Sequence, residues 1–188
     1  MTFSQKLYQK IKSFNNQIAI SQGNKTITYK NLNETSQKVA RLFNDNNLNQ
    51  NIVGIVGQRN FSVYYGILGS IYSNCTYVPI NEKYTEERVI NIIKESKISI
   101  LIGDKKSINS IKNAIYSTDI KVILFPEEED SEGNNILQNH IKYFYKSDFL
   151  DLKPILPREL SPSHIFYILF TSGSTGEPKG VKIRPTTL

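Results

Sequence analysis

The sequence is poor in cysteine and histidine. Its 188 residues include one cysteine, Cys75, and two histidines, His140 and His164. A single cysteine has no partner for an internal disulfide, which is typical of proteins that fold in a reducing compartment, and we expect a cytoplasmic protein. One cysteine and two distant histidines are also too few for a metal site of the usual kind. We therefore interpret Cys75 as a small buried apolar residue.

Long apolar runs and clusters of basic residues are absent as well. The sequence has no stretch of about 18 apolar residues and no charged-then-apolar N-terminus, so neither a membrane span nor a signal peptide is expected. Basic residues exceed acidic ones by 23 to 17, but they are scattered along the chain. Lysines on solvated faces account for the net charge of +6. Nucleic acid is not expected as a partner.

The N-terminal quarter of the chain shows two helical patterns with a hairpin between them. Apolar residues recur at helical spacing in 3–14 and again in 29–48, which is typical of amphipathic helices. Two short β-like runs in 17–29 flank the pair Gly23-Asn24, a combination common in hairpin turns.

Short apolar runs then alternate with helix-like segments through the middle of the chain. The predicted strands cover residues 52–57, 76–80, 98–103 and 120–125. The helices predicted between them have about 12 residues each, and Thr85 is placed to cap the second of these helices. Strands that are apolar throughout and alternate with helices predict parallel-sheet layers covered by helices on both faces. The predicted fold class is therefore α/β.

The C-terminal third is less regular. The acidic run 126–133 is interpreted as an exposed loop, and the segment 136–163, which prolines interrupt, is predicted to be less regular. Residues 164–170 are predicted to form a strand, and 181–183 a half-exposed one.

Between these last two strands lies the stretch TSGSTGEPKG, residues 171–180. It contains three glycines, four hydroxyl residues and one lysine. Such a loop suits a polyphosphate, because glycines let backbone N–H groups converge on an anion while hydroxyls and a lysine add further donors. It is not a Walker A loop, because Lys179 is followed by Gly180 and Val181 rather than by Ser or Thr. Composition alone leaves open a purely structural hairpin tip.

The order of residues in this loop resembles the signature of the adenylate-forming, or AMP-binding, superfamily. The signature reads Thr-Ser-Gly-[Ser/Thr]-Thr-Gly-x-Pro-Lys-Gly, and the matching residues are Thr171, Ser172, Gly173, Ser174, Thr175, Gly176, Pro178, Lys179 and Gly180. Residues 27–33 and 68–102 resemble two earlier segments of the family, the second typical of amino-acid-activating members. The likeness covers nearly the whole chain. It points to the N-terminal part of the fold, as in the adenylation domains of nonribosomal peptide synthetases and in D-alanine–carrier-protein ligases.

Four positions depart from the family pattern. Asn31 stands where an acid is usual, Asn81 where an Asp is usual, Thr85 where a Pro is usual, and Pro185 where many members have His. Some D-alanine-ligating members also lack that His, so the last departure favours their branch.

The resemblance implies ATP-dependent activation of a small carboxylic or amino acid with the help of Mg²⁺. The acid would form an acyl- or aminoacyl-adenylate, and the acyl group would then pass to the phosphopantetheine thiol of a carrier protein or to CoA. Lys179 would be catalytic, neutralising charge as pyrophosphate leaves, while Pro178 would shape the loop. The residues implied to bind the ATP phosphates are Thr171, Ser172, Gly173, Ser174, Thr175, Gly176 and Lys179.

The resemblance also implies that residues 1–188 are the N-terminal portion of an adenylation domain, incomplete and without the C-terminal domain. We therefore expect a fragment that is inactive alone, and a sheet edge near its last strand that leads to marginal stability or self-association. Two alternatives remain open: a non-catalytic module that binds a nucleotide, phosphate or another protein, and the remnant of an interrupted gene. The residues that would choose the acid are not identified in this sequence.

Overall fold

The computed structural model describes residues 2–130, 140–159, 161, 163–172 and 178–185. Its N-terminal part contains the helix, hairpin and helix predicted from the sequence: α1 (Phe3–Ser13), β1 (Ile18–Gln22), β2 (Lys25–Thr28) and α2 (Tyr29–Asp45). Gly23 has φ of 57° at the hairpin turn, a left-handed conformation that glycine adopts without steric cost. Thr28 ends β2 and caps α2, because its side chain accepts a hydrogen bond from the Asn31 N–H.

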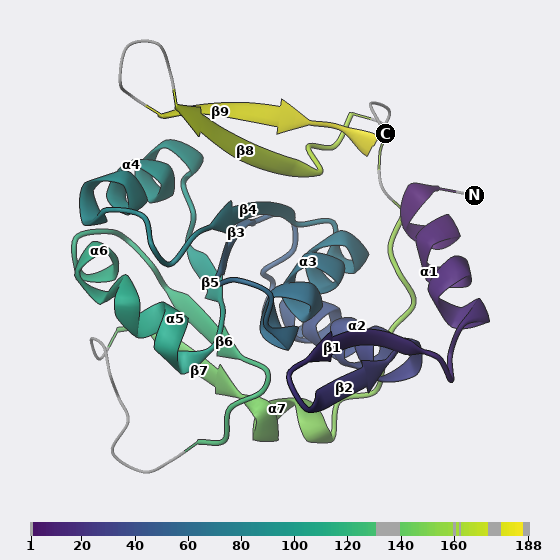
Figure 1. Cartoon of the computed structure of the whole chain (residues 1–188). Coiled ribbons are helices and arrows are strands. Elements are labelled where there is room, and N and C mark those ends of the chain that lie inside the picture. The colour runs from purple at the N-terminus through teal and green to yellow at the C-terminus, as the bar shows by residue number, and fades with distance from the viewer. Residues whose placement is uncertain (1, 131–139, 160, 162, 173–177, 186–188) are drawn as a thin grey trace.

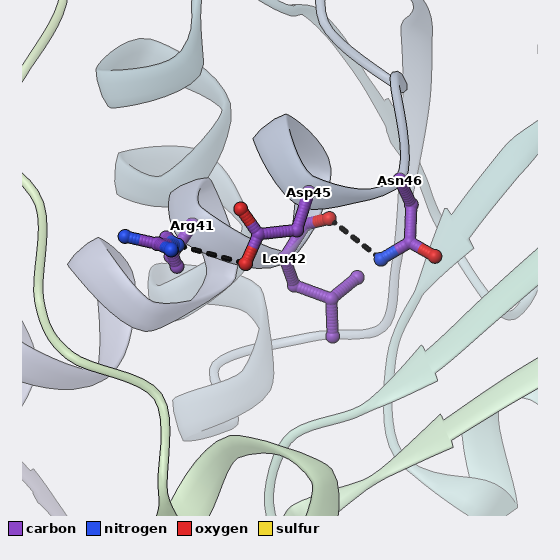
Figure 2. A network of polar contacts seen from close by, with 4 residues as sticks. All are labelled: Arg41, Leu42, Asp45 and Asn46. Atoms are coloured by element: carbon purple, nitrogen blue, oxygen red, sulfur yellow. Dashed lines mark hydrogen bonds and ion pairs between the residues drawn. The ribbon is translucent and has the colours of Figure 1, made fainter.

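Polar side chains close the C-terminal end of α2 (Figure 2). The Asn46 side-chain amide donates to the Leu42 carbonyl at 2.9 Å, and the same carbonyl accepts from the Asn46 backbone N–H at 3.1 Å. One turn earlier on the helix surface, Arg41 and Asp45 form an ion pair at 2.7 Å. Because this pair is exposed, its contribution to stability is small, about 0.3–0.5 kcal/mol.

A seven-stranded sheet forms the centre of the molecule, with strand order β7-β6-β5-β3-β4-β8-β9 (Figure 1). The strands are β3 (Ile52–Val56), β4 (Thr76–Ile80), β5 (Ile100–Ile102), β6 (Val122–Phe125), β7 (Lys142–Tyr145), β8 (Tyr167–Ser172) and β9 (Pro178–Ile183). All neighbouring strands pair in parallel except β8 and β9, which are antiparallel. The remaining helices are α3 (Phe61–Ser73), α4 (Glu86–Ser96), α5 (Lys105–Ser110), α6 (Lys112–Tyr116) and α7 (Lys146–Leu150). The predicted α/β class is confirmed.

Helices cover both faces of the sheet, which explains why its strands are apolar throughout. On β6, Val122 and Leu124 pack into the core with α2 and α3. The residues between and after them, Ile123 and Phe125, pack into the core with α4, α5 and α6. Thr85 caps α4 as predicted, its side chain accepting from the Arg88 N–H.

One prediction about secondary structure was wrong. The third of the helices predicted between the strands, at 106–117, is divided at Ile111, where the backbone leaves helical geometry and α5 gives way to α6. The segment 136–163, expected to be less regular, contains β7 and α7. Stacking of the Phe125 ring on Tyr145, with centroids 5.4 Å apart, helps to hold β7 beside β6.

No helix within the described residues is long and apolar enough to cross a membrane.

Candidate functional site: the β8–β9 hairpin

The signature loop connects two antiparallel strands, as the sequence predicted. In the register of β8 and β9, Thr171 lies opposite Lys179 and Ser172 lies opposite Pro178. The stem of the hairpin thus brings together both ends of the predicted phosphate site. The other predicted phosphate-binding residues lie outside the described residues: Gly173, Ser174, Thr175 and Gly176.

The hairpin leaves the plane of the sheet soon after it begins. Among the described residues, β8 pairs with β4 at one position, Tyr77 opposite Tyr167. The Tyr77 N–H donates to the Phe166 carbonyl at 3.3 Å. Two residues further along β4, the next group that would donate toward β8 belongs to Pro79, which has no N–H. We infer that Pro79 ends the pairing and lets the hairpin swing over α4 (Figure 1).

A hollow of about 460 Å³ lies between α4 and the hairpin. Its helix wall is polar and its strand wall is partly apolar. The lining residues are Asn91, Glu95 and Ser96 of α4, Ile168 and Phe170 of β8, and Pro178, Lys179, Gly180 and Lys182 of β9. This volume is within the range of small-molecule sites, about 300–1,000 Å³.

Positive charge gathers on β9 and directly after it. Lys179, Lys182 and Arg184 follow one another within six residues, and all three are exposed. Among the described residues, neither Lys179 nor Lys182 forms an ion pair. An exposed lysine without a carboxylate partner is available to an anion, and Lys179 is the one nearest to the turn.

The described residues offer little to a metal ion. No group of three or more His, Cys, Asp or Glu side chains among them could hold one. Among the described residues, Glu95 is the one carboxylate that lines the hollow. A Mg²⁺ ion commonly binds through substrate phosphates and one or two carboxylates, so the described residues alone do not build a metal site here.

His164 and Cys75 lie near the base of the hairpin but outside the hollow. The predicted burial of Cys75 is confirmed: the residue is 1% exposed, and burial raises the pKa of its thiol. His164 precedes β8 and is half-buried, and burial lowers its pKa although a hydrogen bond to the Cys75 backbone opposes this effect. Its Nε2 atom is buried without a hydrogen-bond partner among the described residues. Neither side chain contributes to the candidate site.

The sequence analysis did not predict the residues that line the hollow between α4 and the hairpin. Ile168 and Phe170 share one face of β8, a placement that the strand period of two residues could have indicated. The approach of Asn91 and Glu95 from α4 could not have been found from sequence, because it depends on how far the hairpin leaves the sheet.

Comparison with known proteins identifies relatives over nearly the full length of the chain. Residues 7–186 match the family model described as "AMP-binding enzyme". Bacitracin synthase 1 of Bacillus licheniformis is 30% identical over 168 residues, which are 88% of this chain and 3% of that protein. The D-alanine–D-alanyl carrier protein ligase of Staphylococcus epidermidis is 29% identical over 171 residues, 91% of this chain and 30% of that protein.

Solved structures share the fold. A red-emitting luciferase from Phrixothrix hirtus superposes with a TM-score of 0.80 at 24% identity, covering 98% of this chain and 36% of the luciferase. A benzoate CoA ligase from Burkholderia xenovorans gives a TM-score of 0.78 at 14% identity, covering 99% of this chain and 35% of the ligase. The chain therefore spans about a third of these two structures and less of the two curated relatives.

Proposed function

The chain belongs to the AMP-binding enzyme family, and we propose that its β8–β9 hairpin holds the phosphates of ATP while a small carboxylic or amino acid is activated. The observation that carries this proposal is the hairpin register. Residues of the signature occupy both strands beside the turn, with Thr171 facing the exposed Lys179 across the stem.

In the proposed reaction, a carboxylate oxygen of the acid attacks the α-phosphorus of ATP. The bond from that phosphorus to the bridging oxygen breaks, and pyrophosphate leaves with the electron pair. The acyl- or aminoacyl-adenylate is the other product. Such a reaction needs no protein nucleophile, because positioning and charge stabilisation supply the catalysis.

The hairpin supplies the charge stabilisation. The backbone N–H groups and hydroxyls of residues 171–176 would donate to the β- and γ-phosphates, and the Lys179 ammonium would neutralise charge on the departing pyrophosphate. Mg²⁺, arriving with the phosphates, would screen them further.

We propose a thiol as the final acyl acceptor, either the phosphopantetheine of a carrier protein or CoA. The names of two relatives support both kinds: one is a D-alanyl carrier protein ligase and another is a benzoate CoA ligase. We further propose that residues 1–188 form the N-terminal portion of an adenylation domain and do not complete the reaction alone. The small share of its relatives that the chain spans supports this proposal.

Equilibrium binding of pyrophosphate to the 188-residue chain tests the phosphate site. Lys179→Ala is expected to weaken binding by about tenfold or more, the loss typical of one charge-assisted hydrogen bond. Lys182→Ala is the control for diffuse charge: it removes the same charge from the same exposed strand, and Lys182 also borders the hollow, but it lies three residues further from the turn and on the face of Gly180. Equal losses in the two variants, or none in Lys179→Ala, would contradict the proposal.

A second candidate is a non-catalytic module that binds a nucleotide or phosphate, because an exposed Lys179 beside the turn would serve binding without chemistry as well. Acid-dependent exchange between pyrophosphate and ATP separates the two. Exchange by the chain itself would contradict our expectation that it is inactive alone. Exchange by a longer protein that contains these residues would support the enzyme.

A further inference from the structure

Gly180 lies in the middle of β9, where glycine is unfavourable for a strand. Gly180 is not among the residues with positive φ, so the backbone conformation does not require glycine there. Space around it is limited instead. A Cβ atom at Gly180 would lie 3.0 Å from Cγ2 of Ile168 and 3.1 Å from Cζ of Phe170, so a methyl group there requires these neighbours to shift by a few tenths of an ångström. Ile168 and the Phe170 ring together crowd the place that a side chain at Gly180 would take.

Phe170 and Gly180 are directly opposite one another in the hairpin register. An aromatic ring that covers a cross-strand glycine replaces the contacts that the glycine lacks and fixes the two strands against each other. The ring is itself partly buried and packs against the core cluster between the sheet and α4. Through this ring, the loop end of the hairpin is tied to the body of the protein.

Within the part of the chain that the structure describes, the other face of the hairpin has no comparable packing against the core. Leu169 and Val181 form a cross-strand pair there, and they are 43% and 46% exposed. Alternation along β9 places the Lys179 side chain on the same face as Val181, although the residue also borders the hollow that Phe170 lines. The orientation of Lys179 therefore depends on how Ile168 and Phe170 pack against the opposite face of β9.

We propose that Phe170 is a positioning residue: by packing across Gly180 it holds β9 in the orientation that presents Lys179 to a phosphate group. This inference rests on the proposed phosphate-binding function. Because the ring borders the hollow between α4 and the hairpin, it has room to move when it is displaced. A methyl group at Gly180 then shifts the ring and strand by a few tenths of an ångström and leaves the fold intact.

Size-compensating substitutions test the proposal, with pyrophosphate binding as the readout. Gly180→Ala and Phe170→Leu are each expected to weaken binding about threefold to tenfold, because small displacements of a binding group are costly. The double variant Phe170→Leu/Gly180→Ala removes the ring atoms at 3.1 Å and keeps the Ile168 Cγ2 contact at 3.0 Å, so it is expected to bind pyrophosphate more tightly than either single variant. Thermal unfolding of each variant reports whether the fold is retained.

A double-mutant cycle between Gly180→Ala and Lys179→Ala distinguishes a displaced lysine from a general loss of structure. In a Lys179→Ala background, Gly180→Ala is expected to cause no further loss of affinity, because the lysine that it displaces is already gone. A further loss in that background, unchanged binding by Gly180→Ala, or a double variant weaker than either single one would overturn the proposal. If Lys179→Ala binds as wild type does, the proposed function itself fails. If Lys179→Ala is weak and both single variants are normal, only the role of Phe170 fails.

Discussion

Lys179 and Phe170 lie in the same hairpin, but the role of only one of them could be predicted from the sequence. Lys179 could be chosen from the signature alone, because its chemistry and its place in the motif are both visible there. Phe170 could not, since an aromatic residue in an apolar strand carries no sign of the glycine that it covers. That pairing becomes visible once the register places Phe170 opposite Gly180. Sequence therefore predicts groups that would touch a ligand more readily than groups that hold them in place.

His164 allows a test of the buried base of the hairpin. Its pKa is lowered from the ordinary value of 6.5 by burial, so protonation favours the unfolded chain. The stability linked to this group is fully present above pH 6.5 and decreases as the pH falls below that value. Urea unfolding of His164→Gln between pH 7.5 and 5.5 should therefore show a shallower loss of stability than wild type.

His140→Gln is the matched control, because it removes the other histidine from an exposed position. We expect it to keep the wild-type dependence on pH. If His164→Gln loses stability on acidification as steeply as wild type does, the buried imidazole is not the cause.

Helices, strands and the N-terminal hairpin were predicted correctly where the spacing of apolar residues and the turn residues indicate the same element. The buried strands β3, β4, β5 and β6 all lie within the predicted runs. β7 was missed because the aromatic run in Lys142–Tyr145 shows no alternation, and its stability comes from rings stacked across to β6. The exit of β8 from the sheet follows from a missing N–H at Pro79, an effect that requires knowing which strand is the neighbour.

The close contact between helices α2 and α3 predicts how a substitution at Gly69 changes stability. A Cβ atom at Gly69 of α3 would lie 2.5 Å from Cγ1 and 2.7 Å from Cβ of Val39 on α2. Alanine is the better helix former by about 1 kcal/mol, yet we expect Gly69→Ala to destabilise the protein by about 1–3 kcal/mol through overpacking. Chemical denaturation measures the difference.

Val39→Ala/Gly69→Ala removes Cγ1 of Val39 and keeps its Cβ at 2.7 Å, so we expect the double variant to lose less stability than the two single variants added together. A stabilised Gly69→Ala variant would show that helix propensity, and not close packing of α2 against α3, dominates at this position.

At the scale of the whole molecule, charge and an open sheet edge occur together on β9. In the described sheet β9 has one neighbouring strand, β8, and such an edge favours pairing with another chain. Lys179, Lys182 and Arg184 oppose pairing between two copies, because like charges on adjacent strands repel each other. The same charges favour an anion. The expected self-association stays a prediction, and the charges make it dependent on salt.

The central claim is that the turn end of this hairpin is a phosphate site, and lysine acylation of the unmodified chain tests it most directly. Acylation rates at Lys179 and Lys182 would be measured by mass spectrometry with and without saturating pyrophosphate. We predict that pyrophosphate slows modification of Lys179 severalfold and leaves Lys182 unchanged. Equal protection of both lysines would indicate diffuse attraction to a positive strand, and no protection of Lys179 would contradict the account.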